Sequence, residues 1–208
     1  MGQRLVVNIT SNGDILANAY YHWDAYTETA AEQTVSIVSH IESARKLARQ
    51  LLFFNTNIPL EDPDRYKNLD KLTAYLILES TGAGIEKDDE EELNKIVENY
   101  NYRKGNNRNE GLIAITQKNI DESNYWAEGT VDIDISKNEV CFKVFAVFMK
   151  DELEENVKIK KIDFDDIECF KFSELEKWHK KILEICHDTT YPCYCDLSYP
   201  DIYYYVIA

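Results

Sequence analysis

The longest regular pattern in this chain lies between Thr29 and Phe53, where apolar residues recur at the spacing of one helix face. Thr29 and Glu32 have the spacing of a capping box near the start of this run. The apolar face consists of Thr34, Ile37, Val38, Ile41, Ala44, Ala48, Leu51 and Leu52. We therefore expect one long amphipathic helix, with this face packed on a sheet.

The segments on either side of this helix predict a hairpin and three further helices. Two β-prone runs, Arg4 to Ile9 and Ile15 to Tyr21, flank Asn12-Gly13, which is a strong signal for a hairpin turn. Apolar spacing predicts the other helices from Leu69 to a glycine stop at Thr81-Gly82, from Asp88 through Val97, and over Ser173 to Cys186.

The second half of the chain predicts several strands. They are expected at Leu112 to Thr116, Thr130 to Ile135, Val140 to Met149, Val157 to Ile162 and Ile202 to Ile207. The third run is apolar on both faces, which predicts a central strand with cover on both sides. Strands and helices are grouped rather than strictly alternating, so we expect an α+β fold with a mainly antiparallel sheet covered by helices. The expected architecture is a layered sandwich, a type that includes the N-terminal-nucleophile hydrolases, and it forms one domain over residues 1–208.

The charge balance limits the partners of such a domain. The chain has 38 acidic and 23 basic residues and a net charge of −15, while its 44% of apolar residues excludes a disordered acidic tail. Phosphate neutralisation dominates nucleic-acid binding, so a uniformly acidic domain is not expected to bind DNA or RNA directly. A protein partner with a basic groove is expected instead.

The sequence also indicates a compartment. The start MGQRLVV has no basic region followed by a long apolar one, so we expect no secretory leader, and no window approaches the roughly 18 apolar residues that span a bilayer. We therefore expect a cytoplasmic protein without membrane contact. Of the five cysteines, Cys141 and Cys169 lie in apolar sequence like small hydrophobic residues, which predicts reduced thiols.

One short segment suggests catalytic groups. His22 and Asp24 follow the second predicted strand, where they could act as a base and its orienting carboxylate, and Arg103 lies in a basic loop. Local hydrogen bonding is the favoured explanation for His22 and Asp24. Gly2 offers no side-chain nucleophile, and the phosphate-loop, serine-hydrolase and metalloprotease motifs are absent from the sequence.

A group of soft metal ligands occurs near the C-terminus. Cys186, His187, Cys193 and Cys195 would be sufficient in number to bind zinc. Their spacing departs from the paired pattern of zinc sites, so we expect no bound metal and no cofactor.

Carboxylates are concentrated in three runs, which begin at Asp88, Asp151 and Asp163. Such runs are usually solvated faces, but three of them on one domain exceed what solubility requires. The alternative is an acidic face that imitates a phosphate backbone. The partner-binding residues would then be Asp88, Asp89, Glu90, Glu91, Glu92, Asp151, Glu152, Glu154 and Glu155.

Four sequence blocks carry a resemblance to a known group of proteins. They are Gly2 to Ile9 (GQRLVVNI), Leu16 to Thr27 (LANAYYHWDAYT), Arg108 to Thr116 (RNEGLIAIT) and Trp126 to Gly129 (WAEG). In these blocks the chain resembles proteins of unassigned function carried by phages and prophages of Gram-positive bacteria. The resemblance implies an origin in a mobile element and names no catalytic residue.

The association with small acidic phage proteins leads to a functional expectation. Such proteins are often inhibitors of host defence, and those that act on Cas9 with its guide RNA commonly use carboxylates to occupy a basic nucleic-acid site. An anti-CRISPR protein in the cytoplasm of the host bacterium is therefore the leading hypothesis. The alternatives are a small intracellular hydrolase and a phage structural or accessory protein.

Overall fold

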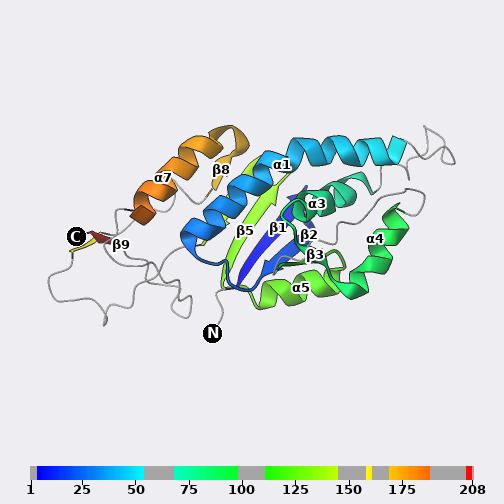
Figure 1. Cartoon of the computed structure of the whole chain (residues 1–208), viewed down its shortest axis with the longest axis horizontal. Helices are drawn as coiled ribbons and strands as arrows, with labels where there is room; N and C mark the ends of the chain where they lie inside the picture. Colours follow the sequence, from blue (N-terminus) through cyan, green and yellow to red (C-terminus); the bar gives the residue numbers. More distant parts are fainter. Residues whose placement is uncertain are drawn as a thin grey trace.

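The computed structural model describes residues 4–53, 68–97, 111–144, 158–160, 169–187 and 205–207. A seven-stranded sheet with the order β3-β4-β2-β1-β5-β6-β8 forms its centre (Figure 1). These strands are β1 (Leu5–Ser11), β2 (Asp14–Tyr21), β3 (Gly84–Ile85), β4 (Gly111–Ala114), β5 (Gly129–Asp134), β6 (Glu139–Lys143) and β8 (Cys169–Lys171). β1 pairs with β5, and β3 with β4, in parallel, while the other neighbours are antiparallel. The predicted α+β fold with a mainly antiparallel sheet is confirmed.

The strand at the middle of the sheet is β1, because β2 and β5 pair with its two edges. Leu5, Val7 and Ile9 belong to the main hydrophobic core, and Val6 on the other face is also fully buried. We expected the strand at Val140 to Met149 to be central and covered on both faces. For the described part of that run, this prediction is wrong. In β6 burial alternates, and Lys143 is exposed. The rest of that run, from residue 145 onward, lies outside the described residues.

The predicted N-terminal hairpin is confirmed. β1 and β2 are joined by Asn12 and Gly13, whose φ angles are 54° and 94°. Two successive positive φ angles belong to the tight turn that matches the twist of paired strands, and Asn-Gly adopts it at little cost. The turn therefore fixes which residues of β1 and β2 face each other.

The long helix is also confirmed, with a start two residues earlier than expected. α1 spans Thr27–Phe53, and its buried positions include Ile37, Ile41 and Ala48. α3 (Leu69–Glu79) lies beside it over the same face of the sheet (Figure 1). After α3 the chain turns through Gly82, whose φ of 83° is the left-handed conformation expected for a glycine stop. α1 and α3 thus cover the face that carries Leu5, Val7 and Ile9.

The remaining helices are shorter. The acidic run forms a 3-10 turn (Lys87–Asp89) followed by α4 (Glu90–Val97), and the last predicted helix is α7 (Leu175–His187), preceded by a 3-10 turn at Phe172–Glu174. The indole of Trp178 from α7 stacks on Phe170 with ring centroids 4.2 Å apart, which attaches the helix to β8. One helix was not predicted: α5 (Gln117–Tyr125) covers part of the opposite face of the sheet.

Two of the five cysteines form a disulfide. Cys141 in β6 and Cys169 in β8 face each other across antiparallel strands, with Cα atoms 4.2 Å apart. Cys169 is exposed and Cys141 half-buried. The expectation that these two cysteines are reduced thiols is therefore wrong, because the pairing of β6 with β8 places their side chains opposite each other.

A second, two-stranded sheet pairs β7 (Lys158–Lys160) with β9 (Tyr205–Ile207) in antiparallel register. The strands predicted at Val157 to Ile162 and Ile202 to Ile207 correspond to it in part. Among the described segments, no helix combines the length and the apolar character that crossing a membrane requires.

Candidate functional site

Several aromatic side chains gather at one end of the sheet because of how its central strands pair. β1 starts where antiparallel β2 ends, with Leu5 opposite Tyr21, and parallel β5 starts at the same level, with Leu5 opposite Gly129. The residues just outside these strands, Arg4, His22 and Glu128, therefore share one end of the molecule. α5 ends there as well, because Glu128 follows it by only a few residues.

Arg4 and Glu128 form the polar centre of this end. The guanidinium donates from Nη2 to Oε1 at 3.0 Å and from Nε to Oε2 at 3.2 Å, and the Arg4 backbone N–H donates to Oε2 at 2.7 Å. The backbone N–H groups of Glu128 and Gly129 donate in turn to the Arg4 carbonyl at 2.8 and 3.1 Å. The hydrogen bond to Glu128 raises the pKa of Arg4 further, so this pair is a fixed ionic clamp between β1 and β5.

Trp126 and Tyr125 project from the end of α5 beside this clamp. The Arg4 guanidinium lies over the Trp126 ring, 5.6 Å from its centroid, and the Tyr125 ring meets Trp126 edge to face at 5.0 Å. Trp126 is nevertheless 51% exposed and Tyr125 79% exposed. Their rings are held in place, but most of their area faces solvent.

Tyr20, His22 and Trp23 continue the group from the end of β2. The Tyr20 hydroxyl and His22 Nδ1 share a hydrogen bond of 3.2 Å, and the His22 ring meets Trp23 edge to face at 4.8 Å. Burial raises the pKa of Tyr20, although the charge of Arg4 opposes that shift, so the phenol stays protonated at neutral pH. Trp23 is 48% exposed.

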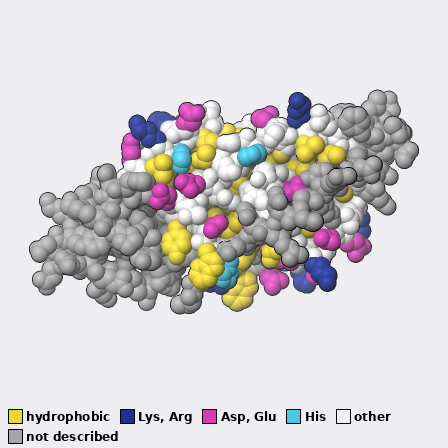
Figure 2. Space-filling view, viewed as in Figure 1, with side chains coloured by type: hydrophobic (Ala, Val, Ile, Leu, Met, Phe, Trp, Pro, Cys, Tyr) yellow, Lys and Arg dark blue, Asp and Glu magenta, His cyan; other side chains and the backbone are white. Residues whose placement is uncertain are grey.

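Leu112 in β4 lies opposite Tyr20 and is 44% exposed. We call the set Tyr20, His22, Trp23, Leu112, Tyr125 and Trp126, with Arg4 among them, the aromatic surface. Figure 2 shows hydrophobic side chains gathered at the lower middle of the molecule, beside a histidine and a basic side chain, where α5 and the N-terminus lie in Figure 1.

The structure does not bring His22 and Asp24 together as a catalytic pair. The hydrogen bond of the His22 ring within the described part of the chain goes to Tyr20, and none goes to Asp24. The charge of Asp24 instead bears on Tyr21, whose pKa is raised mainly by burial. Arg103 lies outside the described residues. We singled out this segment in the sequence for its histidine and aspartate, whereas the side chains that stand out in the structure are its aromatic ones.

The acidic run from Asp88 to Glu92 is not one uniform face. Asp88, Glu90 and Glu91 are exposed, whereas Asp89 is fully buried. Asp89 accepts hydrogen bonds from the backbone N–H groups of Ile115 at 2.7 Å and Thr116 at 3.2 Å. Its assignment as a partner-binding residue is therefore wrong, because it holds the β4–α5 junction from inside. No feature of a run of five acids distinguishes the buried one.

Two further carboxylates, Glu86 and Glu122 of α5, lie near the exposed acids of this run. Burial, followed by the charges of Asp89 and Asp88, raises the pKa of Glu86, and Glu122 of α5 contributes to the same shift. We call Glu86, Asp88 and Glu122 the acidic flank. Glu92 and Glu91 are partly neutralised by Lys71 at 3.2 Å and Lys95 at 3.3 Å.

The other predicted site residues are not described. Asp151, Glu152, Glu154 and Glu155 lie outside the described residues, as do Cys193 and Cys195. Cys186 and His187 end α7, and the structure describes only their backbone. Within the described ranges, no three His, Cys, Asp or Glu side chains are grouped so that they could hold a metal ion.

Comparison of the chain with known protein families, curated proteins and solved structures finds no match. The aromatic surface and the acidic flank are therefore the features whose chemistry bears on function.

Proposed function

We propose that this chain is a protein-binding domain that docks its aromatic surface on a partner and thereby inhibits it. The observation that carries the proposal is the exposure of Trp23, Trp126 and Tyr125, at 48%, 51% and 79%, at the end of the sheet where Arg4 lies over Trp126. Trp, Tyr and Arg dominate the binding energy of protein interfaces, and exposed apolar groups that cluster are typical of interaction sites. None of these rings is needed to fill the core under α1.

The charge of the molecule supports a basic partner. The acidic flank adjoins the α5 side of the aromatic surface, and the net charge of −15 gives a long-range attraction to any positive groove. The aromatic side chains would supply most of the affinity, while the carboxylates would steer the encounter and select the partner. This division of roles predicts that salt weakens binding mainly by slowing association.

The resemblance to phage and prophage proteins suggests the biological form of this inhibition. The blocks that carry it contain Arg4, Tyr20, His22, Trp23, Leu112, Trp126 and Glu128, which is most of the aromatic surface and its clamp. We propose a host defence protein as the partner and a bacterial cytoplasm as the site of action. Cas9 with its guide RNA is the specific candidate, because its nucleic-acid channel is basic.

The first experiment identifies the partner and then measures how tightly the chain binds it. The chain is used to capture proteins from a Gram-positive host, and purified Cas9 with guide RNA is tested in parallel by surface plasmon resonance. Trp126→Ala and Trp23→Ala should each weaken binding by about 2 kcal/mol or more. Leu47→Ala is the matched control, because Leu47 is also an exposed apolar residue, at 38%, but lies on α1 away from this surface.

A second pair of variants separates the aromatic contribution from the electrostatic one. Glu122→Lys should slow association and reduce its salt dependence, whereas Trp126→Ala should mainly speed dissociation. Melting curves establish that each variant is folded. If Trp126→Ala and Trp23→Ala bound the captured partner as tightly as Leu47→Ala does, the aromatic surface would not be the interface and the proposal would fail.

A further inference from the structure

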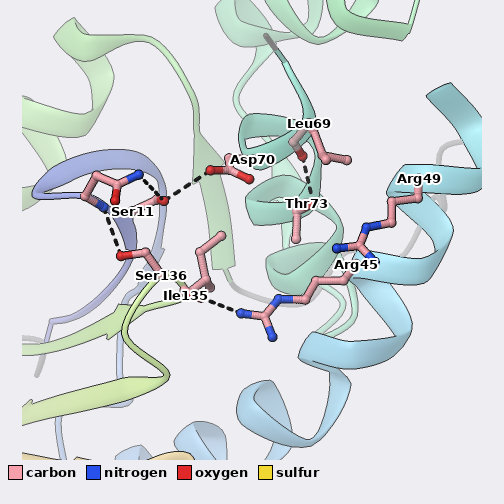
Figure 3. A pocket seen from close by; sticks show the side chains of 9 residues that line it. Ser11, Arg45, Arg49, Leu69, Asp70, Thr73, Ile135 and Ser136 are labelled. Carbon is pink, nitrogen blue, oxygen red and sulfur yellow. Dashed lines mark hydrogen bonds between the residues drawn. The ribbon is translucent and has the colours of Figure 1, made fainter. Parts of the chain in front are cut away.

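A small pocket lies at the other end of the sheet, next to the hairpin turn (Figure 3). Its volume is about 170 Å³, and its walls come from four segments that are distant in the sequence. Ser11 belongs to the hairpin, Arg45 and Arg49 to α1, Asp70 and Thr73 to α3, and Ser136 to the turn between β5 and β6. The aromatic surface contributes no residue to this pocket.

Arg45 is fixed on one wall of the pocket. Its Nη2 donates to the Ile135 carbonyl and, at 3.0 Å, to Asn138 Oδ1, while Nη1 donates to Glu42. These bonds orient the guanidinium plane without using all of its donors. The Nε–H group and the second Nη1–H group have no partner within the described part of the chain.

Arg49 follows one helical turn later and brings a second positive charge to the same space. Figure 3 shows both arginine side chains extending from α1 toward the hairpin and the start of α3. Arg49 makes no hydrogen bond or ion pair with another described residue, whereas Arg45 has three partners. Arg49 is exposed and lines the pocket, and no carboxylate of the described segments is paired with it.

The opposite wall is polar and already ordered. Ser11 Oγ donates to Asp70 Oδ2 at 3.1 Å, the Asn12 backbone N–H donates to Ser136 Oγ at 3.1 Å, and the Thr73 hydroxyl donates to the Leu69 carbonyl at 2.7 Å. These bonds leave Asp70 Oδ1 as an available acceptor among the groups that line the pocket. The pocket therefore has donors and positive charge on one side and a carboxylate acceptor on the other.

We propose that this pocket binds a small acidic molecule that carries a phosphate or carboxylate group together with a hydroxyl or ammonium group. The oxyanion would accept hydrogen bonds from Arg49 and Arg45, because guanidinium groups match the geometry of such anions. The hydroxyl or ammonium group would donate to Asp70. The volume of about 170 Å³ suits a small metabolite rather than a drug-sized ligand.

The test uses the intact chain and three probes, namely inorganic phosphate, succinate and O-phosphoserine, with sodium chloride at equal ionic strength as the reference. Amide shifts of Asn12, Thr73 and Ser136 in NMR titrations should move and saturate with O-phosphoserine and with at least one simple anion. Which simple anion binds more tightly distinguishes phosphate from carboxylate recognition. No saturable shift at these amides with any of the probes would overturn the proposal.

Variants localise the site. Arg49→Gln should weaken binding of O-phosphoserine about tenfold or more, because a charge-assisted contact is lost. Lys46→Gln is the matched control, since Lys46 is an exposed cation on the same helix that does not line the pocket, and it should change affinity less than about twofold. Asp70→Asn should reduce the preference for O-phosphoserine over phosphate. Equal losses in the Lys46 and Arg49 variants would show a general charge effect and refute the site.

Discussion

Asp89 has a different role from the four acids that follow or precede it. Its carboxylate lies in the core and bonds the backbone N–H groups of Ile115 and Thr116, where β4 ends and α5 is about to begin. A negative charge at this place also favours the start of the helix. One residue thus ties the acidic 3-10 turn to a junction 26 residues later in the chain.

The Asp89→Ala substitution should lower the free energy of unfolding by about 3 kcal/mol, since two backbone donors lose a charged acceptor in a buried place. Asp88→Ala, one residue earlier and exposed, should change it by less than about 0.5 kcal/mol. Urea denaturation of the two variants measures the difference. Similar values for both would contradict the structural role of Asp89.

Asp134 makes a pH-dependent contribution to the free energy of unfolding, and it lies two residues before Ser136 of the small pocket. Its Oδ1 accepts from the Ser136 backbone at 2.9 Å, the Ser136 hydroxyl at 2.6 Å and the Lys137 backbone at 3.0 Å. Burial raises the pKa, but these hydrogen bonds together outweigh it and lower the pKa of Asp134 to about 2, from 3.8 in an unperturbed aspartate.

Because the folded state holds the ionised form more strongly, the stabilisation by Asp134 is present above pH 3.8 and disappears as the pH falls toward about 2. Asp134→Ala should therefore lower the free energy of unfolding by about 2 kcal/mol at neutral pH and by much less near pH 2. Urea titrations of both proteins over this range test it. A penalty that stays constant down to pH 2 would show that the charge of Asp134 is irrelevant.

α1 illustrates which helices a sequence specifies well. Its apolar spacing continues over about seven turns, so an error of one or two residues in the position of either helix end does not change which face is predicted to be buried. The buried Ile41 and Ala48 were predicted correctly. α5 gave no such signal. Only Ile120 is buried in it, and Asn124 attaches it to the sheet by hydrogen bonds with Asn8. A helix that rests on polar groups has no apolar period to detect.

The face of α1 can be tested with two apolar residues of that helix. Ile41 is 1% exposed and Leu47 38% exposed. Ile41→Asp should lower the free energy of unfolding by several kcal/mol, about 4 kcal/mol or more, because it places an unpaired charge in the core, and Leu47→Asp should have little effect. Thermal melting followed by circular dichroism distinguishes the two. If both variants melted like the parent, the helix would not pack as described.

The sheet shows where sequence reasoning failed for a different reason. Pairing of β1 with β5 joins Leu5 to Gly129 across most of the described chain, and no local pattern encodes such a contact. β1 is buried on both faces, but one of these faces carries the polar Asn8, whose side chain donates a hydrogen bond to Asp132 at 2.8 Å. This polar residue interrupts the apolar run, so the sequence resembled that of a hairpin strand with one solvent-facing side. The aromatic surface depends on this pairing, because it brings the end of β2 and the segment after α5 to the same end of the sheet, and the sequence does not show that these segments meet.

The charge of the domain affects folding and binding in opposite directions. Thirty-eight acids and 23 bases give −15, and this excess repels itself in the compact state. The half-buried pair Lys71–Glu92 and the exposed pair Lys95–Glu91 oppose the repulsion, but surface ion pairs contribute only about 0 to 1 kcal/mol each. Repulsion should therefore dominate the response to salt.

We expect sodium chloride to raise the urea midpoint of unfolding as its concentration increases from about 0.01 M to about 1 M, since the Debye length falls from about 30 Å to about 3 Å. Over the same range, association with a basic partner should slow, because the attraction that steers it is screened by the same ions. Glu122→Lys should reduce both effects, since it removes excess negative charge from the acidic flank. If salt lowered the midpoint instead, the ion pairs would outweigh the repulsion, and the surface would be organised for pairing within the chain rather than for attraction of a partner.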